Sequence, residues 1–423
     1  MNKQKSKTRS KAALLVIILA GESIFFLPFV LARIFRPTLL NVFEISNLEL
    51  GLAFSVYGIV AMISYFFGGP LADKFSARNL MALALWATAL GGLIMSLVPS
   101  NNVLIALYGY WGFTTIFLFW AAMIRATREW GGDDFQGRAF GYLEGGRGLA
   151  AALIGTLVLF IFSLFLDVDS STGLSDEHNG SFQVVILTTS FIVALSGLLV
   201  WVYLPKVNPK HFEAKKSPTA KKVLEIIKMP AIWMQGIIII CAYVGYKITD
   251  DYSLYANQVL GMDEIASAGV GTSALWLRPI FAVMAGILAD RLSGARVISW
   301  SFMFMFFGGL MIYLGLFESL SWVTLIILAS TLVGVYGIRG IYFALMKESA
   351  VPLKATGTAV GIMSVVGFTP DVFMSPAMGY LLDNFPGPQG HRYVFLVLTG
   401  FAIIGLVVSF FLRNHISKIN KGS

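Results

Sequence analysis

Long apolar runs recur along the chain, and they constrain its fold more than any other feature. A helix needs about 20 mainly apolar residues to cross the hydrocarbon core of a bilayer. Runs of this kind occur twelve times, separated by short polar or Pro/Gly-rich segments. They cover approximately 12–34, 48–72, 79–98, 102–124, 137–166, 182–204, 230–256, 265–289, 297–317, 320–345, 357–382 and 391–412. No segment alternates apolar and polar residues as a half-buried strand does, so we expect an all-α membrane protein.

The composition agrees with lipid as the main solvent of the side chains. The chain is 57% hydrophobic and 13% charged, whereas a soluble domain carries about 25% charged residues. Its single cysteine, Cys241, excludes an intramolecular disulfide.

The net charge of +8 is distributed unevenly between alternate loops. With the N-terminus in the cytoplasm, nearly all loop Lys and Arg residues fall on the cytoplasmic side, as the positive-inside rule requires. We therefore expect a multi-pass protein of the bacterial inner membrane with both termini cytoplasmic. The first run contains Glu22 and Pro28 and is longer than a signal-peptide core, so it predicts a retained helix. The basic residues predict contact with membrane lipids and no nucleic-acid partner.

A Lys-, Pro- and Ala-rich segment divides the twelve runs into six and six. We expect a cytoplasmic tail at 1–11, an N-terminal six-helix bundle at 12–204, a cytoplasmic linker at 205–229, a C-terminal six-helix bundle at 230–412 and a second tail at 413–423.

The two halves repeat one another in sequence. Gly69–Lys74 (GPLADK) after the second run matches Gly286–Arg291 (GILADR) after the eighth. Gly137–Gly141 (GRAFG) at the fifth run matches Gly357–Gly361 (GTAVG) at the eleventh, at nearly the same offset along the chain. Two repeats in nearly constant register predict two similar bundles.

These repeated loops resemble the signature loop of the major facilitator superfamily, and the resemblance covers essentially the whole chain. The first copy departs from that signature, with Phe75-Ser76-Ala77-Arg78 where a glycine is usual. The resemblance implies two pseudo-symmetric bundles around a central cavity. It also implies a gating role at the cytoplasmic side for Asp73, Lys74, Asp290 and Arg291; the alternative is ordinary loop charge.

Shorter motifs resemble a narrower branch of that superfamily, the organophosphate and organic-anion permeases. They are Phe119-Trp120 followed by Arg125, and Arg33 before the next loop. The segment Glu144–Gly148 (EGGRG) resembles a group of bacterial permeases.

Ten ionisable residues fall inside the predicted spans. Each costs roughly 2.5–3.5 kcal/mol when it faces lipid at mid-bilayer, so all ten together would cost about 30 kcal/mol. We therefore expect them to pair, to line a cavity or to lie near an interface. They are Glu22, Arg33, Glu144, Arg147, Lys247, Asp250, Asp251, Arg278, Arg339 and Asp371.

Cations from both halves favour an anionic substrate, because Arg and Lys bind carboxylate, phosphate or sulfonate groups. The candidate substrate-binding residues are Arg33, Arg147, Lys247 and Arg278, with the neighbouring aromatics Trp120 and Tyr246. Alternatively, Arg147 only pairs with Glu144 at i−3, Lys247 only pairs with Asp250 or Asp251, and Arg33 extends to the membrane surface. Arg339, in the cytoplasmic third of its span, is a candidate for gating or for binding.

Acids inside the membrane suggest coupling to protons, because burial favours the neutral form of a carboxylate. Glu22, Glu144 and Asp371 are the candidate proton-coupling residues; alternatively they serve as counter-ions of the arginines. Asp371 follows Pro370 and precedes Pro376, where a broken helix can hinge.

The sequence thus predicts a secondary active transporter of a small organic anion, acting as a monomer by alternating access with a proton or a counter-anion. No phosphate-binding loop, metal cluster or nucleophile motif occurs, so we expect no enzyme activity and no cofactor. The alternatives are a proton-driven exporter of amphipathic drugs or lipids, which predicts an acid-dominated cavity, and a receptor or sensor built on the same fold.

Overall fold

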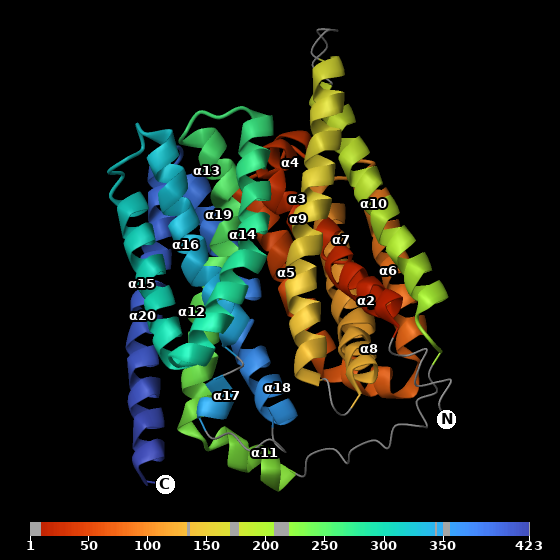
Figure 1. Cartoon of the computed structure of the whole chain (residues 1–423). Coiled ribbons are helices and arrows are strands. Elements are labelled where there is room, and N and C mark those ends of the chain that lie inside the picture. Colours follow the sequence, from red (N-terminus) through yellow and green to blue (C-terminus); the bar gives the residue numbers. More distant parts are fainter. Residues whose placement is uncertain are drawn as a thin grey trace. The chain divides into compact units, whose positions relative to one another are not determined.

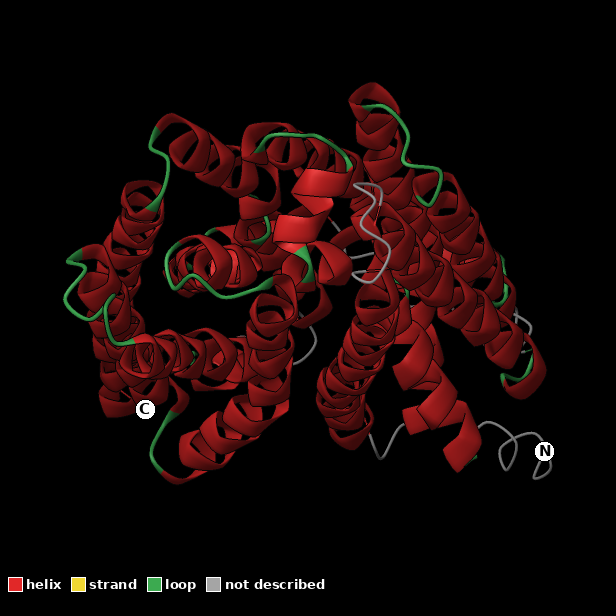
Figure 2. Cartoon of the chain, turned by 90° about the horizontal axis from the view of Figure 1, so that it is seen from above, coloured by secondary structure: helices red, strands yellow, loops and turns green. Residues whose placement is uncertain are grey.

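The computed structural model describes residues 10–132, 136–169, 177–206, 220–342, 345–349 and 356–422. Within these ranges the regular structure is helical throughout, and no strand occurs. Twelve helical segments are long and apolar enough to cross a membrane. The prediction of an all-α protein with twelve membrane helices is therefore confirmed (Figure 1, Figure 2). The outer parts of the predicted tail and linker, 1–9 and 207–219, lie outside the described residues.

The contacts between residues divide the chain into two compact units. Unit 1 comprises Met1–Glu213 and Met262–Trp276, and unit 2 comprises Ala214–Gly261 and Leu277–Ser423. Residues 262–276, which the sequence division places in the second bundle, are thus grouped with unit 1.

Six membrane segments belong to the first part of unit 1. Their elements are α2 (Lys11–Ser23), η1 (Phe26–Val30), α3 (Leu31–Ile34), α4 (Arg36–Val42), α5 (Asn47–Lys74), α6 (Ala77–Met95), α7 (Asn101–Gly112), η2 (Phe113–Trp120), α8 (Ala121–Gly131), α9 (Gln136–Asp169) and α10 (Glu177–Tyr203). The long helix α14 (Glu264–Arg291) contributes its first half to this unit. There Thr38 donates to Glu264 Oε2 at 2.9 Å, and Trp276 Nε1 donates to Thr156 Oγ1 at 2.9 Å.

Unit 2 contains the second half of α14 together with elements that precede and follow it in the sequence. These are α11 (Ala220–Ile227), α12 (Pro230–Ile248), η4 (Thr249–Asp251), α13 (Tyr252–Gln258), α15 (Gly294–Tyr313), α16 (Ser321–Ile341), α17 (Leu345–Glu348), α18 (Thr356–Gly367), α19 (Pro370–Asn384) and α20 (Pro388–Gly422).

The repeated loops cap the following helices in the same way. The Ser76 side chain accepts from the amide of Asn79 at the start of α6, and the Ser293 side chain accepts from the amide of Arg296 at the start of α15. Ser76 and Ser293 occupy equivalent positions in the two copies of the repeated loop motif. Because a serine at this position satisfies one of the unpaired amides of a helix start, the repeat preserves structure as well as sequence.

Several membrane helices are interrupted where polar or proline residues occur. Pro28 lies inside the π-helical segment η1, since it has no amide to donate to the preceding turn. A 3₁₀ turn, η4, separates α12 from α13, and residues 368–369 separate α18 from α19. The last break lies directly before Asp371, where the sequence predicts a broken helix.

Candidate functional site

Unit 1 holds a buried cluster of one guanidinium and two carboxylates. Arg147 lies on α9, and its Nε is 3.2 Å from Glu22 Oε2 on α2. Its Nη1 donates to Glu144 Oε1 at 3.0 Å, one turn earlier on α9. Glu22 and Arg147 are buried, but the Glu144 side chain is 55% exposed. The cluster thus joins three residues that the sequence predicts as site residues, with one carboxylate accessible and the other enclosed.

Glycines allow α2 and α9 to approach closely enough for this contact. A Cβ on Gly21 would lie 2.7 Å from Met123 Sδ and 3.3 Å from Arg147 Cδ. A Cβ on Gly146 would lie 2.7 Å from Ile18 Cδ1. Gly141 and Gly145, on the same helix, have no such neighbour within 4 Å. Close approach therefore depends on the glycines directly beside Glu22 and Arg147.

Two aromatic rings flank the Arg147 guanidinium. Its Cζ lies 5.6 Å from the centre of the Phe25 ring and 5.7 Å from the Trp120 ring, within the range of cation–π attraction. The two rings pack edge to face at 6.2 Å. Trp120 therefore lies beside a cation, as the sequence predicts. Phe25 is a second aromatic neighbour of Arg147, which the sequence does not predict.

Both aromatic residues lie at the ends of π-helical segments. Phe25 immediately precedes η1, where the Val30 amide donates to the Phe25 carbonyl five residues earlier. Trp120 is the last residue of η2. Segments of π-helix are rare and frequently occur at functional sites, because the extra residue turns side chains out of regular register. Their meeting at Arg147 marks this part of unit 1 as a candidate binding site.

Unit 2 holds a corresponding cluster around Lys247 on α12. Lys247 Nζ lies 3.3 Å from Asp250 Oδ2 and 3.6 Å from Asp371 Oδ1 on α19. The Tyr243 hydroxyl donates to both carboxylate oxygens of Asp371, at 3.2 and 3.0 Å. Lys247 and Asp250 are each 2% exposed, and Asp371 is 16% exposed. A lysine, a nearby acid and a more distant acid are again brought together.

Arg339 of α16 belongs to the same part of unit 2. Its Cζ lies 4.1 Å from the centre of the Tyr246 ring and 6.0 Å from the Tyr243 ring. Tyr243 also packs against Tyr246 and Phe368, at 5.5 and 5.0 Å between ring centres. Arg339 therefore lies beside the tyrosine that binds Asp371.

Unit 2 also contains a buried contact between a histidine and a carboxylate that the sequence does not predict. His391 Nδ1 lies 2.8 Å from Asp251 Oδ2, and His391 Nε2 lies 3.0 Å from Gln258 Oε1. The side chains of His391 and Asp251 are both fully buried. The sequence offers Asp251 as a possible partner of Lys247. The structure instead places Asp251 and His391 in an internal contact that joins η4 and α13 to α20.

The remaining predicted cations are buried as well. Arg33 of α3 is 1% exposed and Arg278 of α14 is 5% exposed. The burial of Arg33 argues against the alternative that its side chain extends to the membrane surface. Arg36, the first residue of α4, is buried too and donates from Nε and Nη2 to Asn47 Oδ1 at 3.2 and 3.1 Å.

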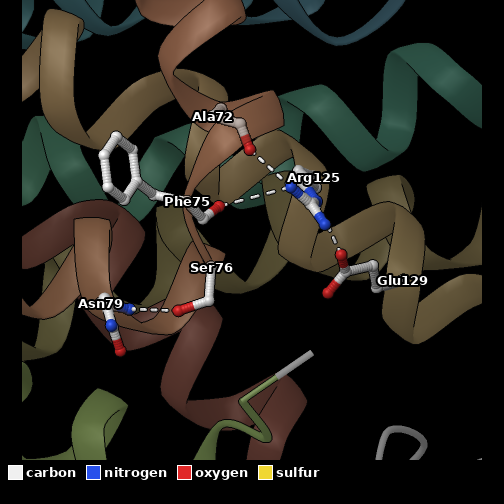
Figure 3. A network of polar contacts seen from close by, with 6 residues as sticks. All are labelled: Ala72, Phe75, Ser76, Asn79, Arg125 and Glu129. Atoms are coloured by element: carbon white, nitrogen blue, oxygen red, sulfur yellow. Dashed lines mark hydrogen bonds and ion pairs between the residues drawn. The ribbon is translucent and has the colours of Figure 1, made fainter. Parts of the chain in front are cut away.

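The predicted gating residues lie at the exposed ends of α5 and α14. Asp73, Lys74, Asp290 and Arg291 are all exposed. The contact that secures the first loop comes instead from Arg125 of α8, whose Nη1 donates to the carbonyls of Ala72 at 2.5 Å and Phe75 at 3.4 Å (Figure 3). Glu129 accepts from Arg125 Nε at 2.7 Å (Figure 3). A cation at the last carbonyls of a helix is favoured by the helix dipole, so Arg125 fixes the end of α5.

In unit 2 the corresponding loop is held by an acid. Glu348 of α17 accepts from the amides of Gly294 and Ala295, at 2.5 and 3.4 Å, at the start of α15. Glu348 follows Glu129 at nearly the same offset as the repeated motifs. The two halves thus place acids at similar sequence positions, but Glu129 accepts from an arginine side chain and Glu348 from backbone amides.

The described residues contain no group of three or more His, Cys, Asp or Glu side chains that could hold a metal ion. Both clusters consist of ion-paired side chains with aromatic residues beside them.

Comparison with known proteins gives one family over most of the chain. The model of the Major Facilitator Superfamily matches residues 13–371. Among curated proteins of Escherichia coli (strain K12), inner membrane protein YqcE is 28% identical, with 96% of this chain and 95% of that protein covered. Inner membrane protein YihN is 26% identical, with 98% of each chain covered.

Solved structures share the fold at lower sequence identity. A bacterial homologue of the human lysosomal transporter Spinster, inward-facing and unoccupied, superposes with a TM-score of 0.77 at 14% identity, covering 97% of this chain and 98% of that one. The nucleoside transporter NupG gives a TM-score of 0.69 at 14% identity, covering 96% and 99%. At this identity the similarity concerns the fold alone.

Proposed function

We propose that this chain, which belongs to the major facilitator superfamily, imports or exports a small organic anion across the bacterial inner membrane, with Arg147 as a principal contact. Membership makes the chain a membrane transporter and not an enzyme. The substrate class, a phosphate ester, carboxylate or sulfonate, is our proposal. So are a monomeric state, both termini in the cytoplasm, and gating by Asp73, Lys74, Asp290 and Arg291.

The observation that carries the proposal is the unequal exposure of the two carboxylates on Arg147. Glu22 is 4% exposed and Glu144 is 55% exposed. An incoming anion reaches the guanidinium most easily by replacing the exposed carboxylate, while Glu22 stays as the fixed counter-ion. Because Arg binds carboxylate and phosphate oxygens in the same planar geometry, a substrate anion can take the place of Glu144.

Replacement of a carboxylate by an anion provides a simple means of proton coupling. When Glu144 is ionised, it competes with the substrate for Arg147 Nη1. When Glu144 takes up a proton, its attraction for the guanidinium weakens and an anion binds in its place. Substrate and proton then bind together and leave together, which is the requirement for symport. In the anion-exchange alternative, a counter-anion rather than Glu144 occupies Arg147 between transport cycles.

Unit 2 supports the same scheme with a second accessible acid. Asp371 is the more exposed of the two acids on Lys247, and it lies directly after the break between α18 and α19. A carboxylate at such a break can change its distance from Lys247 without disturbing the pair of Lys247 with Asp250. We therefore propose Asp371 as the proton-coupling residue of unit 2, with Arg33, Arg278 and Tyr246 as further candidate substrate contacts.

One observation favours a different substrate. The described contacts bring two carboxylates to a single cation in each unit. A lipophilic cation could therefore bind Glu144 or Asp371 beside the aromatic rings, as in an exporter of amphipathic drugs. This is the second candidate function.

Thermal stabilisation of the purified chain distinguishes the two. The panel comprises organic phosphates, carboxylates, sulfonates and lipophilic cations, each tested on either side of neutral pH. A ligand at 100 times its dissociation constant adds about 2.7 kcal/mol of apparent stability. For an anion symporter we expect stabilisation by one anion class, stronger at the lower pH and lost in Arg147→Gln.

Glu144→Gln is the informative partner variant. It should keep the anion stabilisation and lose its pH dependence, because the neutral amide no longer competes as an ionised group. Arg138→Gln, which removes an exposed arginine from the same helix, is the charge-matched control. Stabilisation by lipophilic cations alone, lost in Glu144→Gln and kept in Arg147→Gln, would establish the exporter. Anion stabilisation that ignores pH in every variant would favour anion exchange.

A further inference from the structure

A groove lies on unit 2 between α15 and α20, away from the clusters described above. The two helices lie side by side, with α20 at the edge of the bundle in Figure 1. The groove has a volume of about 420 Å³, within the usual size of ligand sites in proteins. It is lined by Ser299, Trp300, Met303, Leu406, Val407, Phe410, Phe411 and Arg413.

Most of the lining is apolar and turned outward. Trp300, Met303, Val407, Phe410 and Phe411 are all exposed. Both helices are membrane spans, so their outward apolar faces meet lipid tails. A recess in such a face accommodates an acyl chain.

One end of the groove carries two arginines. The Ser299 and Ser409 hydroxyls are hydrogen bonded at 2.9 Å, which fixes the register of the antiparallel helices. Arg296 precedes Ser299 by three residues, and Arg413 follows Ser409 by four. At 1.5 Å per residue, the two arginines therefore lie about 4.5 and about 6 Å beyond the serine pair, toward the same end. The charge distribution predicts that this end is cytoplasmic.

The arginines are available to an external anion. Both side chains are exposed. Within the described part of the chain, no carboxylate lies within ion-pair distance of either guanidinium. On α15, Arg296, Trp300, Met303 and Phe307 follow one another at helical spacing and are all exposed, so a basic position continues directly into an apolar stripe.

We propose that this groove binds an anionic phospholipid of the cytoplasmic leaflet, with its phosphate between Arg296 and Arg413 and an acyl chain along Trp300 and Val407. Basic pockets between membrane helices on the cytoplasmic side are suited to anionic head groups, and a tryptophan at this level anchors the interface. A second copy of the chain docked symmetrically would bring four arginines together and repel. The proposal rests on the predicted orientation and is independent of the transported substrate.

Native mass spectrometry of the whole chain in detergent tests the site. The probes are phosphatidylglycerol, cardiolipin and phosphatidylcholine with the same acyl chains. We expect one tightly retained anionic lipid per chain, with phosphatidylcholine bound at least about tenfold more weakly. Each basic residue near a membrane surface contributes about 1 kcal/mol, so Arg296→Gln/Arg413→Gln should weaken retention by about tenfold or more.

Two further variants separate the head group from the groove. Lys206→Gln/Lys228→Gln removes two exposed cytoplasmic charges elsewhere and should retain the lipid as the unmodified chain does. Val407→Trp fills the groove without changing charge and should also release it. Equal retention of anionic and zwitterionic lipid, or equal loss in both double variants, would overturn the proposal. Dimers that disappear in Val407→Trp would show a second copy as the occupant and overturn it too.

Discussion

The ion clusters of the two units have the same composition, one cation with two acids, but a different acid of the two is exposed in each unit. In each, a buried cation contacts one acid three residues away on its own chain segment and a second acid from another helix. In unit 1 the local acid, Glu144, is exposed and the distant acid, Glu22, is enclosed. In unit 2 the local acid, Asp250, is enclosed and the distant acid, Asp371, is the more exposed. In the function proposed above, the enclosed acid of each unit is the fixed counter-ion and the more exposed acid is the replaceable one.

This difference separates two tasks that a buried ion pair can perform. A cation that lost all its carboxylates inside the bundle would be left without compensation, at a cost of several kcal/mol. A permanent counter-ion avoids that cost, so the second acid can be protonated or displaced while the cluster remains stable. We infer that Glu144 and Asp371 respond to substrate and proton, whereas Glu22 and Asp250 are structural. This inference moves proton coupling away from Glu22, which sequence reasoning had proposed for it.

Among the variants of the two clusters, removal of the cation should lower the stability of the chain most. Arg147→Met leaves Glu22 buried without its cation, and breaking a buried pair in this way typically costs about 3–5 kcal/mol. Lys247→Met should cost a similar amount, because Asp250 is equally enclosed. The apparent melting temperature in detergent measures both.

Glu22→Gln/Arg147→Met serves as the control for this first prediction. Removing the stranded charge together with its partner should recover a large part of the lost stability. If the double variant is no more stable than Arg147→Met, the burial of Glu22 is not the origin of the loss.

Replacing the acids should cost less stability than replacing the cations. The acid on the same chain segment as the cation should matter less than its partner in unit 1 and more than its partner in unit 2. Glu22→Gln and Asp250→Asn each remove a fixed counter-ion and should cost about 1–3 kcal/mol. Glu144→Gln should cost less than about 1 kcal/mol, as for other exposed pairs. Asp371→Asn should fall between these, because it also weakens the hydrogen bonds from Tyr243.

The same melting experiment, run on the four variants side by side, ranks the acids. Our distinction between fixed and replaceable acids requires the local acid to matter less in unit 1 and more in unit 2. If replacing the local acid costs less stability than replacing the distant acid in both units, or more in both, the distinction is wrong.

Sequence reasoning identified features that depend on local spacing. The twelve helices follow from the length of the apolar runs, and Arg147–Glu144 and Lys247–Asp250 follow from their spacing of three residues. It did not identify Glu22–Arg147 or His391–Asp251, whose members lie on helices far apart in the sequence. Such pairs depend on which helix faces meet, and for Glu22 this is decided by the close approach at Gly21 and Gly146. The contacts of Arg125 with the carbonyls of Ala72 and Phe75 were not predicted, because any sequence provides backbone carbonyls. Its pair with Glu129, four residues later, does follow from local spacing but was not singled out.

The smallest effect that we predict concerns the two repeated loops. Glu348 contacts the first amides of α15 directly, whereas Glu129 reaches the corresponding loop only through Arg125. An acid at a helix N-terminus contributes about 0.3–1 kcal/mol. Glu348→Gln should therefore speed amide hydrogen exchange at Gly294 and Ala295, while Glu129→Gln leaves the start of α6 unchanged because Ser76 still caps it. Faster exchange at the start of α6 in Glu129→Gln would mean that the two loops are held in the same way, and the contrast between the units would then be confined to their buried ion clusters.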